Sequence, residues 1–466
     1  MVFYTGESYF LAEIFLQRGI ALVYLVAFLV IVKQYTSLVG ENGLYPIKEF
    51  ISNSKFRKNP SLFYFLPDDR YLELGGIIGL ALAFITLVGI SDYFSPVISI
   101  IVWTSLWVLF ISFRNTGQLF WRQGAVLVEA GFLAIFLGVI GTQASDILIW
   151  LFRWTLFRVM FNSGLAKLKG DKCWKDLTCL NHQFETQPFP SPLSWNFHHL
   201  PTFVKKLGVI LTFFTMLVVP WFYFAPQPYA AYAGAITILY QVNIFLSGNY
   251  SWLNLTAIVL AFSTFSDQVL TSVIPILGEI NYSVLHPYPY PEFALLLSAF
   301  VLVLSINPVK DMFLSSKKEV TYGKMPLVNI YGKFAEVERE RKEIVIKGTN
   351  CENHDQEDWR EYRFQYLPPR ADCRPPQVAP YYHRLDYAIW EHIRDPEINE
   401  NILERIFEAI LEPKEDVLRL FKQVPFEEPP DKIKADLYRY EFTEPSQRDQ
   451  TGNYWKREKL RTLKEN

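Results

Sequence analysis

Long apolar runs separated by short polar joints occupy the first two thirds of this 466-residue chain. A helix needs about 20 mostly apolar residues to cross about 30 Å of hydrocarbon, and runs of this length are typical of helices that do so. We therefore predict a polytopic α-helical membrane bundle of about seven to nine spans. The predicted spans are 14–32, 72–91, 96–113, 124–141, 146–165, 207–225, 229–247, 252–276 and 292–307.

The pattern changes near residue 310, where the apolar runs end. Alternating apolar and polar positions predict strands at 340–348, 359–366 and 434–443, and helical spacing predicts helices at 384–394, 398–411 and 415–423. We predict a transmembrane domain over 1–310, with polar loops at 33–71 and 166–206. A small soluble α+β, β-rich C-terminal domain follows over 311–466.

Charge follows the same division. Residues 311–466 carry 58 of the 92 charged side chains, and the net charge is −2. No basic face is evident, so we predict no nucleic-acid partner; membrane lipid is the expected surrounding, and self-association is left open. With nine spans, both polar loops and the C-terminal domain lie on one side, and their lysines favour the cytoplasmic side.

The loop 166–206 gathers unusual chemistry. His182, Glu185 and His198 suggest a metal site, but neighbouring prolines break any regular scaffold and no HExxH pattern exists. We predict no metal and no cofactor, and a hydrogen-bonded polar cluster instead. Five residues separate Cys173 from Cys179, so a local disulfide is one interpretation and free thiols are the other.

Charged residues inside predicted spans are expected to find partners within the bundle. Glu129 is expected to pair with Arg153 or with Arg158. Lys167 follows an apolar run, so it either reaches toward lipid headgroups or acts as a base with a lowered pKa. Asn249 and Asn254 begin N-x-S/T sequons, which also occur by chance.

Several separated blocks resemble the lipase maturation factors, a family of endoplasmic reticulum membrane proteins. The first half contributes four blocks: E-x-G-F-L-x-I-F (129–136), FNSGLAKL (161–168), L-N-x-x-x-E-T-Q-P-x-P-x-P-L-x-W (180–195) and H-x-L-P (198–201). The tail contributes four more: W-x-x-Y-x-F-x-Y (359–366), R-P-P-x-V-A-P (374–380), R-L-D-x-x-x-W (384–390) and L-Y-R-Y-x-F-T (437–443).

The resemblance implies folding, assembly and maturation of secreted clients, namely lipases of the lipoprotein lipase type, by a protein that is not an enzyme. It places the protein in the endoplasmic reticulum membrane, with loops and tail in the lumen; in a prokaryote the plasma membrane would take its place. Long loops cross regardless of charge, so we prefer this orientation to the lysine count.

The resemblance also directs attention to two groups of residues. The loop residues expected to bind clients or to hold the loop are Asn162, Gly164, Lys167, Asn181, His182, Glu185, Gln187, Trp195 and His198. The residues expected on the surface of the C-terminal domain are Trp359, Arg374, Arg384, Asp386, Trp390 and Tyr438. Aromatic side chains such as these, with Trp174, suit recognition of a protein client.

A more distant resemblance is to the vitamin K-dependent carboxylase group, which carries a G-L-x-K-L element after a span. Here that element is Gly164 to Leu168. In that group its lysine is the base, so the alternative function is a membrane-integral enzyme in which Lys167 is catalytic.

Overall fold

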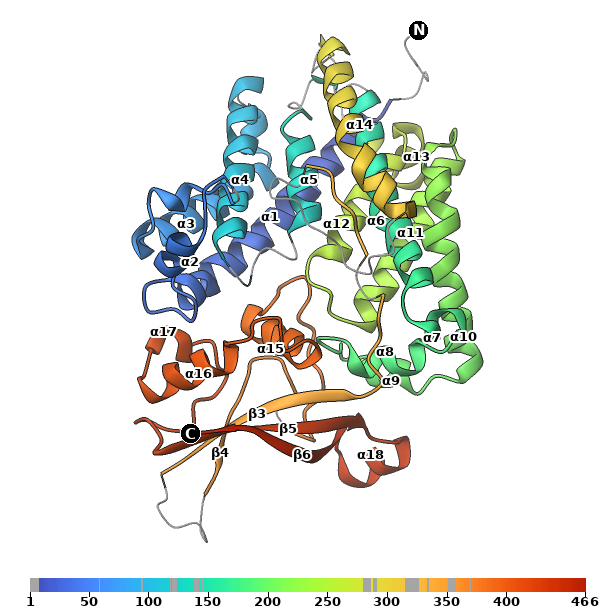
Figure 1. The fold of residues 1–466 in the computed structure, drawn as a ribbon. Coiled ribbons are helices and arrows are strands. Elements are labelled where there is room, and N and C mark those ends of the chain that lie inside the picture. The colour runs from blue at the N-terminus through green and yellow to red at the C-terminus, as the bar shows by residue number, and fades with distance from the viewer. Residues whose placement is uncertain are drawn as a thin grey trace.

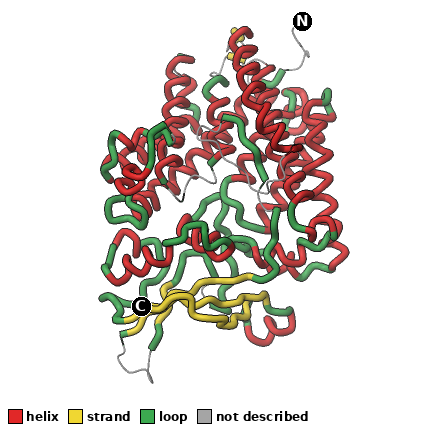
Figure 2. Tube along the Cα trace, in the orientation of Figure 1, coloured by secondary structure: helices red, strands yellow, loops and turns green. Residues whose placement is uncertain are grey.

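The computed structural model describes most of the chain. The described residues are 8–57, 59–93, 95–117, 119, 124–137, 142–143, 146–279, 286–287, 291–314, 327–332, 335–350, 358–368 and 370–466. A bundle of helices forms one end of the molecule and a twisted sheet forms the other, with a layer of short helices between them (Figure 1). The sheet lies at the end remote from the N-terminus (Figure 2).

Helix α1 (Phe10–Val39) is the centre of the bundle, and most of its side chains are buried. It packs against α3 (Asp69–Leu87), α4 (Pro96–Thr116), α5 (Ala125–Ala134) and α12 (Leu253–Ala261). Gly79 permits the close approach of α3, since a side chain there would overlap the Phe28 ring. The remaining bundle helices are α6 (Asp146–Lys169), α10 (Thr202–Phe213), α11 (Tyr229–Ser247), α13 (Asp267–Val273) and α14 (Pro291–Leu314).

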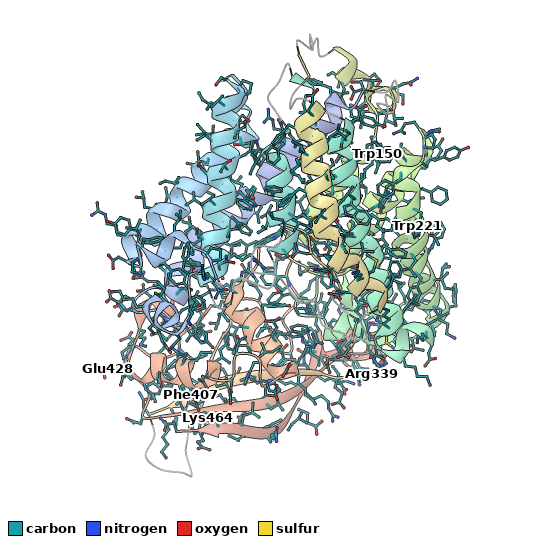
Figure 3. All side chains as sticks on the ribbon, turned by 45° about the horizontal axis from the view of Figure 1, so that its top comes forward. Trp150, Trp221, Arg339, Phe407, Glu428 and Lys464 are labelled. Atoms are coloured by element: carbon teal, nitrogen blue, oxygen red, sulfur yellow. A yellow bond between two sulfur atoms is a disulfide. The ribbon has the colours of Figure 1, made fainter. Side chains whose placement is uncertain are left out.

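The described residues include six helices that are long and apolar enough to cross a membrane. These are α1, α3, α4, α10 with its continuation to Phe224, α11 and α14. A seventh arises if the pair Leu253–Thr264 and Asp267–Val273, bent by 111°, counts as one span. Apolar side chains cover the outside of the bundle, where Trp221 is 56% exposed (Figure 3).

Two of the predicted spans differ from this set. The run 124–141 contains the ten-residue helix α5, which is too short to cross a bilayer alone. The run 146–165 lies in α6, whose hydropathy is reduced by Arg153 and Arg158. Both arginines are buried inside the bundle. These two helices are therefore shielded from lipid by their neighbours.

The C-terminal sheet is antiparallel, in the order β4-β3-β5-β6. Strands β3 (Arg341–Thr349), β4 (Arg360–Tyr362) and β5 (Lys432–Phe442) fall where alternation predicts them. Strand β6 (Trp455–Glu465) was not predicted, because its sequence is mostly charged. Charged side chains are common on edge strands, where they discourage pairing with other chains.

Short helices join the sheet to the bundle. Helices α15 (Arg384–Arg394), α16 (Ile402–Leu411) and α17 (Glu415–Leu418) lie between the two layers (Figure 1). The Arg384 backbone N–H donates to Gln34 Oε1 on α1 at 2.8 Å. Arg405 forms an ion pair with Glu49 at 2.6 Å. The C-terminal region therefore rests directly on the membrane bundle.

Candidate functional site

The chain between α6 and α10, residues 170–201, is here named the helical loop. It contains α7 (Lys172–Lys175), α8 (Leu180–Thr186) and α9 (Ser194–His198). The Asp171 carboxylate accepts from the Cys173 backbone N–H at 2.9 Å and so caps α7. Cys173 and Cys179 are disulfide-bonded, and both are buried. A covalent link thus closes the first part of the helical loop.

Arg341 on β3 holds the middle of the helical loop. It is 2% exposed. Its Nη1 donates to the carbonyls of Glu185 at 2.9 Å and Gln187 at 2.6 Å, and its Nη2 donates to the Pro188 carbonyl at 3.2 Å. A planar guanidinium suits several fixed acceptors at once. The proline-rich turn, whose prolines lack N–H groups, thereby gains partners for its carbonyls.

Three further side chains join the helical loop to the C-terminal region. Trp195 Nε1 donates to the Thr443 carbonyl at 3.0 Å, and Trp390 Nε1 donates to the Thr186 carbonyl at 3.3 Å. Arg374 donates to the Pro192 carbonyl at 3.1 Å. These bonds run between segments more than 180 residues apart, so the helical loop and the sheet form one body.

Asn249, between α11 and α12, joins the same parts. Its Nδ2 donates to the carbonyls of Pro190 at 3.1 Å and Pro376 at 3.0 Å. Its Oδ1 accepts from the N–H groups of Val378 and Ala379, both at 2.8 Å. Asn249 is 1% exposed, so this sequon is closed to a glycan in the folded protein. Asn254, at 3% exposed, is equally inaccessible.

Burial sets the protonation of two predicted loop residues. The buried Glu185 carboxylate accepts from the Phe442 backbone N–H, and burial raises the pKa of Glu185 to about 7. Burial also lowers the pKa of His198 to about 4, helped by the nearby His199 and Lys205. Burial likewise lowers the pKa of the half-buried His182. Among the described residues, no group of three or more His, Cys, Asp and Glu side chains is placed to hold a metal ion.

On its bundle side, the helical loop closes a cavity of about 610 Å³ between α6, α10, α11 and α12. Lys167 lines it, at 5% exposed, with Nζ 5.3 Å from the centre of the Trp174 ring. Gly164 packs tightly against Leu217, which lies in the helical segment that continues α10. Asn162 is buried in α6 but does not line the cavity. The FNSGLAKL block therefore serves helix packing and one wall of a cavity.

The expected surface of the C-terminal domain is wrong in four places. Arg384, Asp386, Trp390 and Tyr438 are all less than 10% exposed. Asp386 accepts from the Tyr366 N–H at 2.6 Å and lies 2.7 Å from His383 Nδ1. Arg384, Asp386 and Trp390 are buried because α15 lies between the sheet and the bundle. Tyr438, on the central strand β5, is buried in a cluster with Trp195 and Trp455. Exposure of the anchors Trp174 and Trp195 is also contradicted, since both are buried.

The other predicted residues vary in exposure. Gln187 is 3% exposed, and its Nε2 donates to Ser194 Oγ at 2.8 Å. Asn181 and Trp359 are partly buried, and Lys434 Nζ lies 3.3 Å from the Trp359 ring centre. Arg374 is exposed. The predicted residues therefore divide between a buried framework and a few accessible positions.

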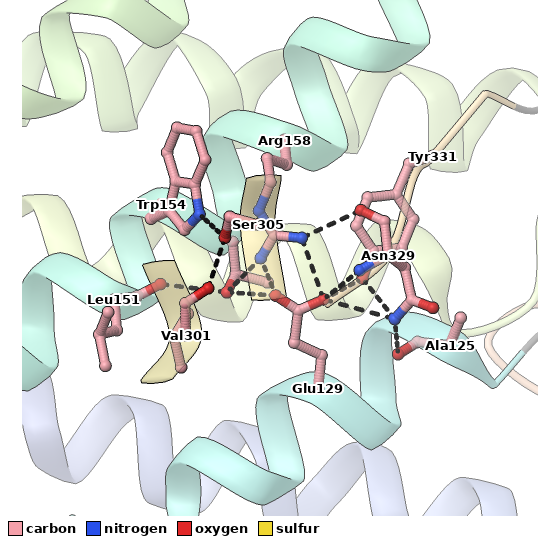
Figure 4. A network of polar contacts seen from close by, with 10 residues as sticks. Ala125, Glu129, Leu151, Trp154, Arg158, Val301, Ser305, Asn329 and Tyr331 are labelled. Carbon is pink, nitrogen blue, oxygen red and sulfur yellow. Dashed lines mark hydrogen bonds and ion pairs between the residues drawn. The ribbon is translucent and has the colours of Figure 1, made fainter. Parts of the chain in front are cut away.

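Glu129 is the hub of a buried polar network inside the bundle (Figure 4). It forms an ion pair with Arg158, one of its two predicted partners. Glu129 also accepts from Thr155 Oγ1 at 2.9 Å and from the Tyr331 hydroxyl at 2.7 Å. Arg153 instead donates to the Ser263 carbonyl at 2.8 Å. The network ties the segment 327–332, which follows α14 in the chain, into the bundle.

Comparison with known proteins agrees with this architecture. The lipase maturation factor transmembrane domain matches residues 11–272, and the lipase maturation factor C-terminal domain matches residues 327–464. The chain belongs to the lipase maturation factor family. It is similar to lipase maturation factor 1 of Bos taurus, at 32% identity over 97% of this chain and 88% of that protein. Lipase maturation factor 1 of Mus musculus is also 32% identical, over 98% and 87%.

Lipase maturation factor 2 of Homo sapiens is a more divergent relative, at 25% identity over 96% of this chain and 81% of that protein. No solved structure matches the chain. The family domains meet between residues 272 and 327, the region that contains α14. Both domains contribute to the body formed by the helical loop and the sheet.

Residue patterns did not reveal Arg341 or Asn249. Arg341 lies in the run ERERKE, where every residue is charged and none stands out. Asn249 has a signal, the sequon, but that signal points to glycosylation instead of to backbone bonding. Neither position is distinguished by residue type, because only the fold brings their partners together.

Proposed function

We propose that this chain is a membrane-embedded factor for the folding, assembly and maturation of secreted lipases, of the lipoprotein lipase type, in the endoplasmic reticulum. The observation that carries the proposal is the match to both family domains, together with relatives named lipase maturation factor 1 that align over 97–98% of the chain.

The geometry supports a platform for protein clients. The helical loop and the sheet form one body on one face of the bundle, and it is braced by Arg341, Trp195 and Asn249. Because these residues are buried, we assign them to holding the platform and not to touching the client. Client contact falls to exposed positions such as Arg374 and strand β6, where Leu460 is 40% exposed. We place this face in the lumen.

The direct test is expression with a lipoprotein lipase-type client in cells that lack their own maturation factor. We expect secreted lipase activity per unit of lipase mass to rise with the wild-type chain. Cross-linking through a photoreactive residue at Leu460 should capture the lipase. The matched control carries the probe at Ser272 on α13, which is also exposed. Unchanged lipase activity, or equal capture from both positions, would refute the proposal.

The alternative function is a membrane enzyme with Lys167 as base, and the cavity wall around Lys167 is the observation that favours it. The same lipase assay separates the two functions. Arginine retains the charge but does not deprotonate in proteins. Full client maturation by Lys167→Arg would rule out proton transfer by Lys167, whereas loss in a folded Lys167→Arg protein would favour it.

A further inference from the structure

The cavity behind the helical loop opens sideways between α10 and α11. Four of its lining residues lie on the outer surface of these two helices: Leu207 and Leu211 on α10 are each 50% exposed, and Ile236 and Leu239 on α11 are 38% and 70% exposed. Both helices belong to candidate membrane spans. The mouth of the cavity therefore faces the hydrocarbon of the bilayer.

The lining changes character along the membrane normal. Lys167 near the end of α6 and Lys205 near the start of α10 both lie next to the helical loop, at the polar end. Val159 and Met160 lie about two helical turns deeper on α6, or roughly 10 Å. The cavity is thus apolar in its depth and cationic at the boundary with the helical loop.

Three polar side chains of the lining already have partners. The Thr212 hydroxyl donates to the Gly208 carbonyl at 2.9 Å, the Tyr240 hydroxyl donates to Thr212 at 3.2 Å, and Asn254 Nδ2 donates to the Gln241 carbonyl at 3.2 Å. Among the described residues that line the cavity there are two lysines and no Asp or Glu. An occupant is therefore expected to offer hydrocarbon to the depth and negative charge to the lysines.

We propose that this cavity binds an anionic phospholipid from the surrounding bilayer. An acyl chain enters between α10 and α11, and the phosphate lies at Lys167 and Lys205. A volume of about 610 Å³ falls within the range of about 300–1,000 Å³ usual for small-molecule sites. Lys205 Nζ donates to the His198 carbonyl at 3.0 Å, so this lysine also contacts the end of α9 in the helical loop. This site is independent of the proposed function in lipase maturation.

The test is native mass spectrometry of the purified full-length chain titrated with dioleoyl-phosphatidylglycerol, dioleoyl-phosphatidylcholine or oleate. We expect the wild type to prefer phosphatidylglycerol. Lys167→Met and Lys205→Met should each weaken that binding about fivefold, the effect of one lysine near an anionic headgroup. Leu239→Trp, at the mouth, should weaken binding of both phospholipids.

Lys206→Met is the matched control, because Lys206 is exposed, adjacent in sequence and outside the cavity lining. It should bind phosphatidylglycerol as the wild type does. Should Lys167→Met fail to fold, Lys205→Met alone carries the test. Equal binding of the two phospholipids, or an equal loss in Lys206→Met, overturns the proposal. Oleate binding as tightly as phosphatidylglycerol overturns the phospholipid assignment in favour of a fatty acid.

Discussion

At the scale of single residues, Glu185 couples the helical loop to strand β5 through a protonation equilibrium. Its folded pKa is raised to about 7 by burial, against about 4.3 in an unfolded chain. The folded state thus holds the proton more tightly. Its contribution to stability is complete below about pH 4.3 and is lost as pH rises through about 7, with an upper limit of about 4 kcal/mol. We expect the melting temperature to fall between pH 5 and pH 8.

Glu185→Gln should flatten that decline, because the amide oxygen still accepts from Phe442 N–H and does not ionise. The measurement is thermal unfolding in detergent from pH 5 to pH 8. His198 acts with the opposite sign: its folded pKa is lowered to about 4, so its contribution is lost as pH falls below about 6.5. His198 is present in both proteins, so its contribution cancels when the melting temperatures of wild type and Glu185→Gln are subtracted at each pH. An unchanged slope in Glu185→Gln would contradict the assignment.

At the scale of elements, the Glu129–Arg158 pair fastens α6 to α5 inside the bundle. Removing one partner of a buried pair leaves an uncompensated charge and costs about 3–5 kcal/mol. Arg158→Met should therefore lower the melting temperature in detergent sharply, and the double variant Glu129→Gln, Arg158→Met should recover part of the loss. Arg419→Met is the control, since Arg419 is 70% exposed and a surface pair is worth about 0–1 kcal/mol. Equal effects of Arg158→Met and Arg419→Met would refute the claim.

How far the sequence predicts these elements depends on the physical signal each one carries. Strand β5 alternates clearly, and α15 has a clean helical stripe, so both were predictable. Edge strand β6 has too many charges for alternation to be visible. The spacing along the sequence also did not decide whether Glu129 pairs with Arg153 or with Arg158. The choice depends on the rotation of α6, which aims Arg153 at the Ser263 carbonyl instead.

For the candidate site, the sequence did not predict which side chains are exposed. Composition drew attention to the helical loop, and its functional role stays a prediction. Trp195 and Trp390 were expected to face a partner and are buried. An indole serves a client surface and an internal joint equally well, because each needs an apolar body and one N–H donor. Only the fold, which brings the Thr443 and Thr186 carbonyls to these two donors, separates the alternatives.

At the scale of the whole molecule, the joints between the helical loop and the sheet place both on the same face of the membrane. Arg341 and Trp195 could not bond across a bilayer. We therefore expect Asn196→Cys, at an exposed position of the helical loop, and Lys464→Cys in β6, where the lysine side chain is 36% exposed, to react with a membrane-impermeant maleimide from the same side of sealed vesicles. The background carries serine at Cys351 and Cys373.

Ser272→Cys is the control for the opposite face, because α13 lies at the end of the bundle remote from the sheet (Figure 1). It should react only from the other side, and all three positions should react once the vesicles are permeabilised. If Asn196→Cys and Lys464→Cys reacted from different sides, the hydrogen bonds that join the helical loop to the sheet could not exist in the membrane. A platform built from both would then be impossible, whichever compartment the two parts faced.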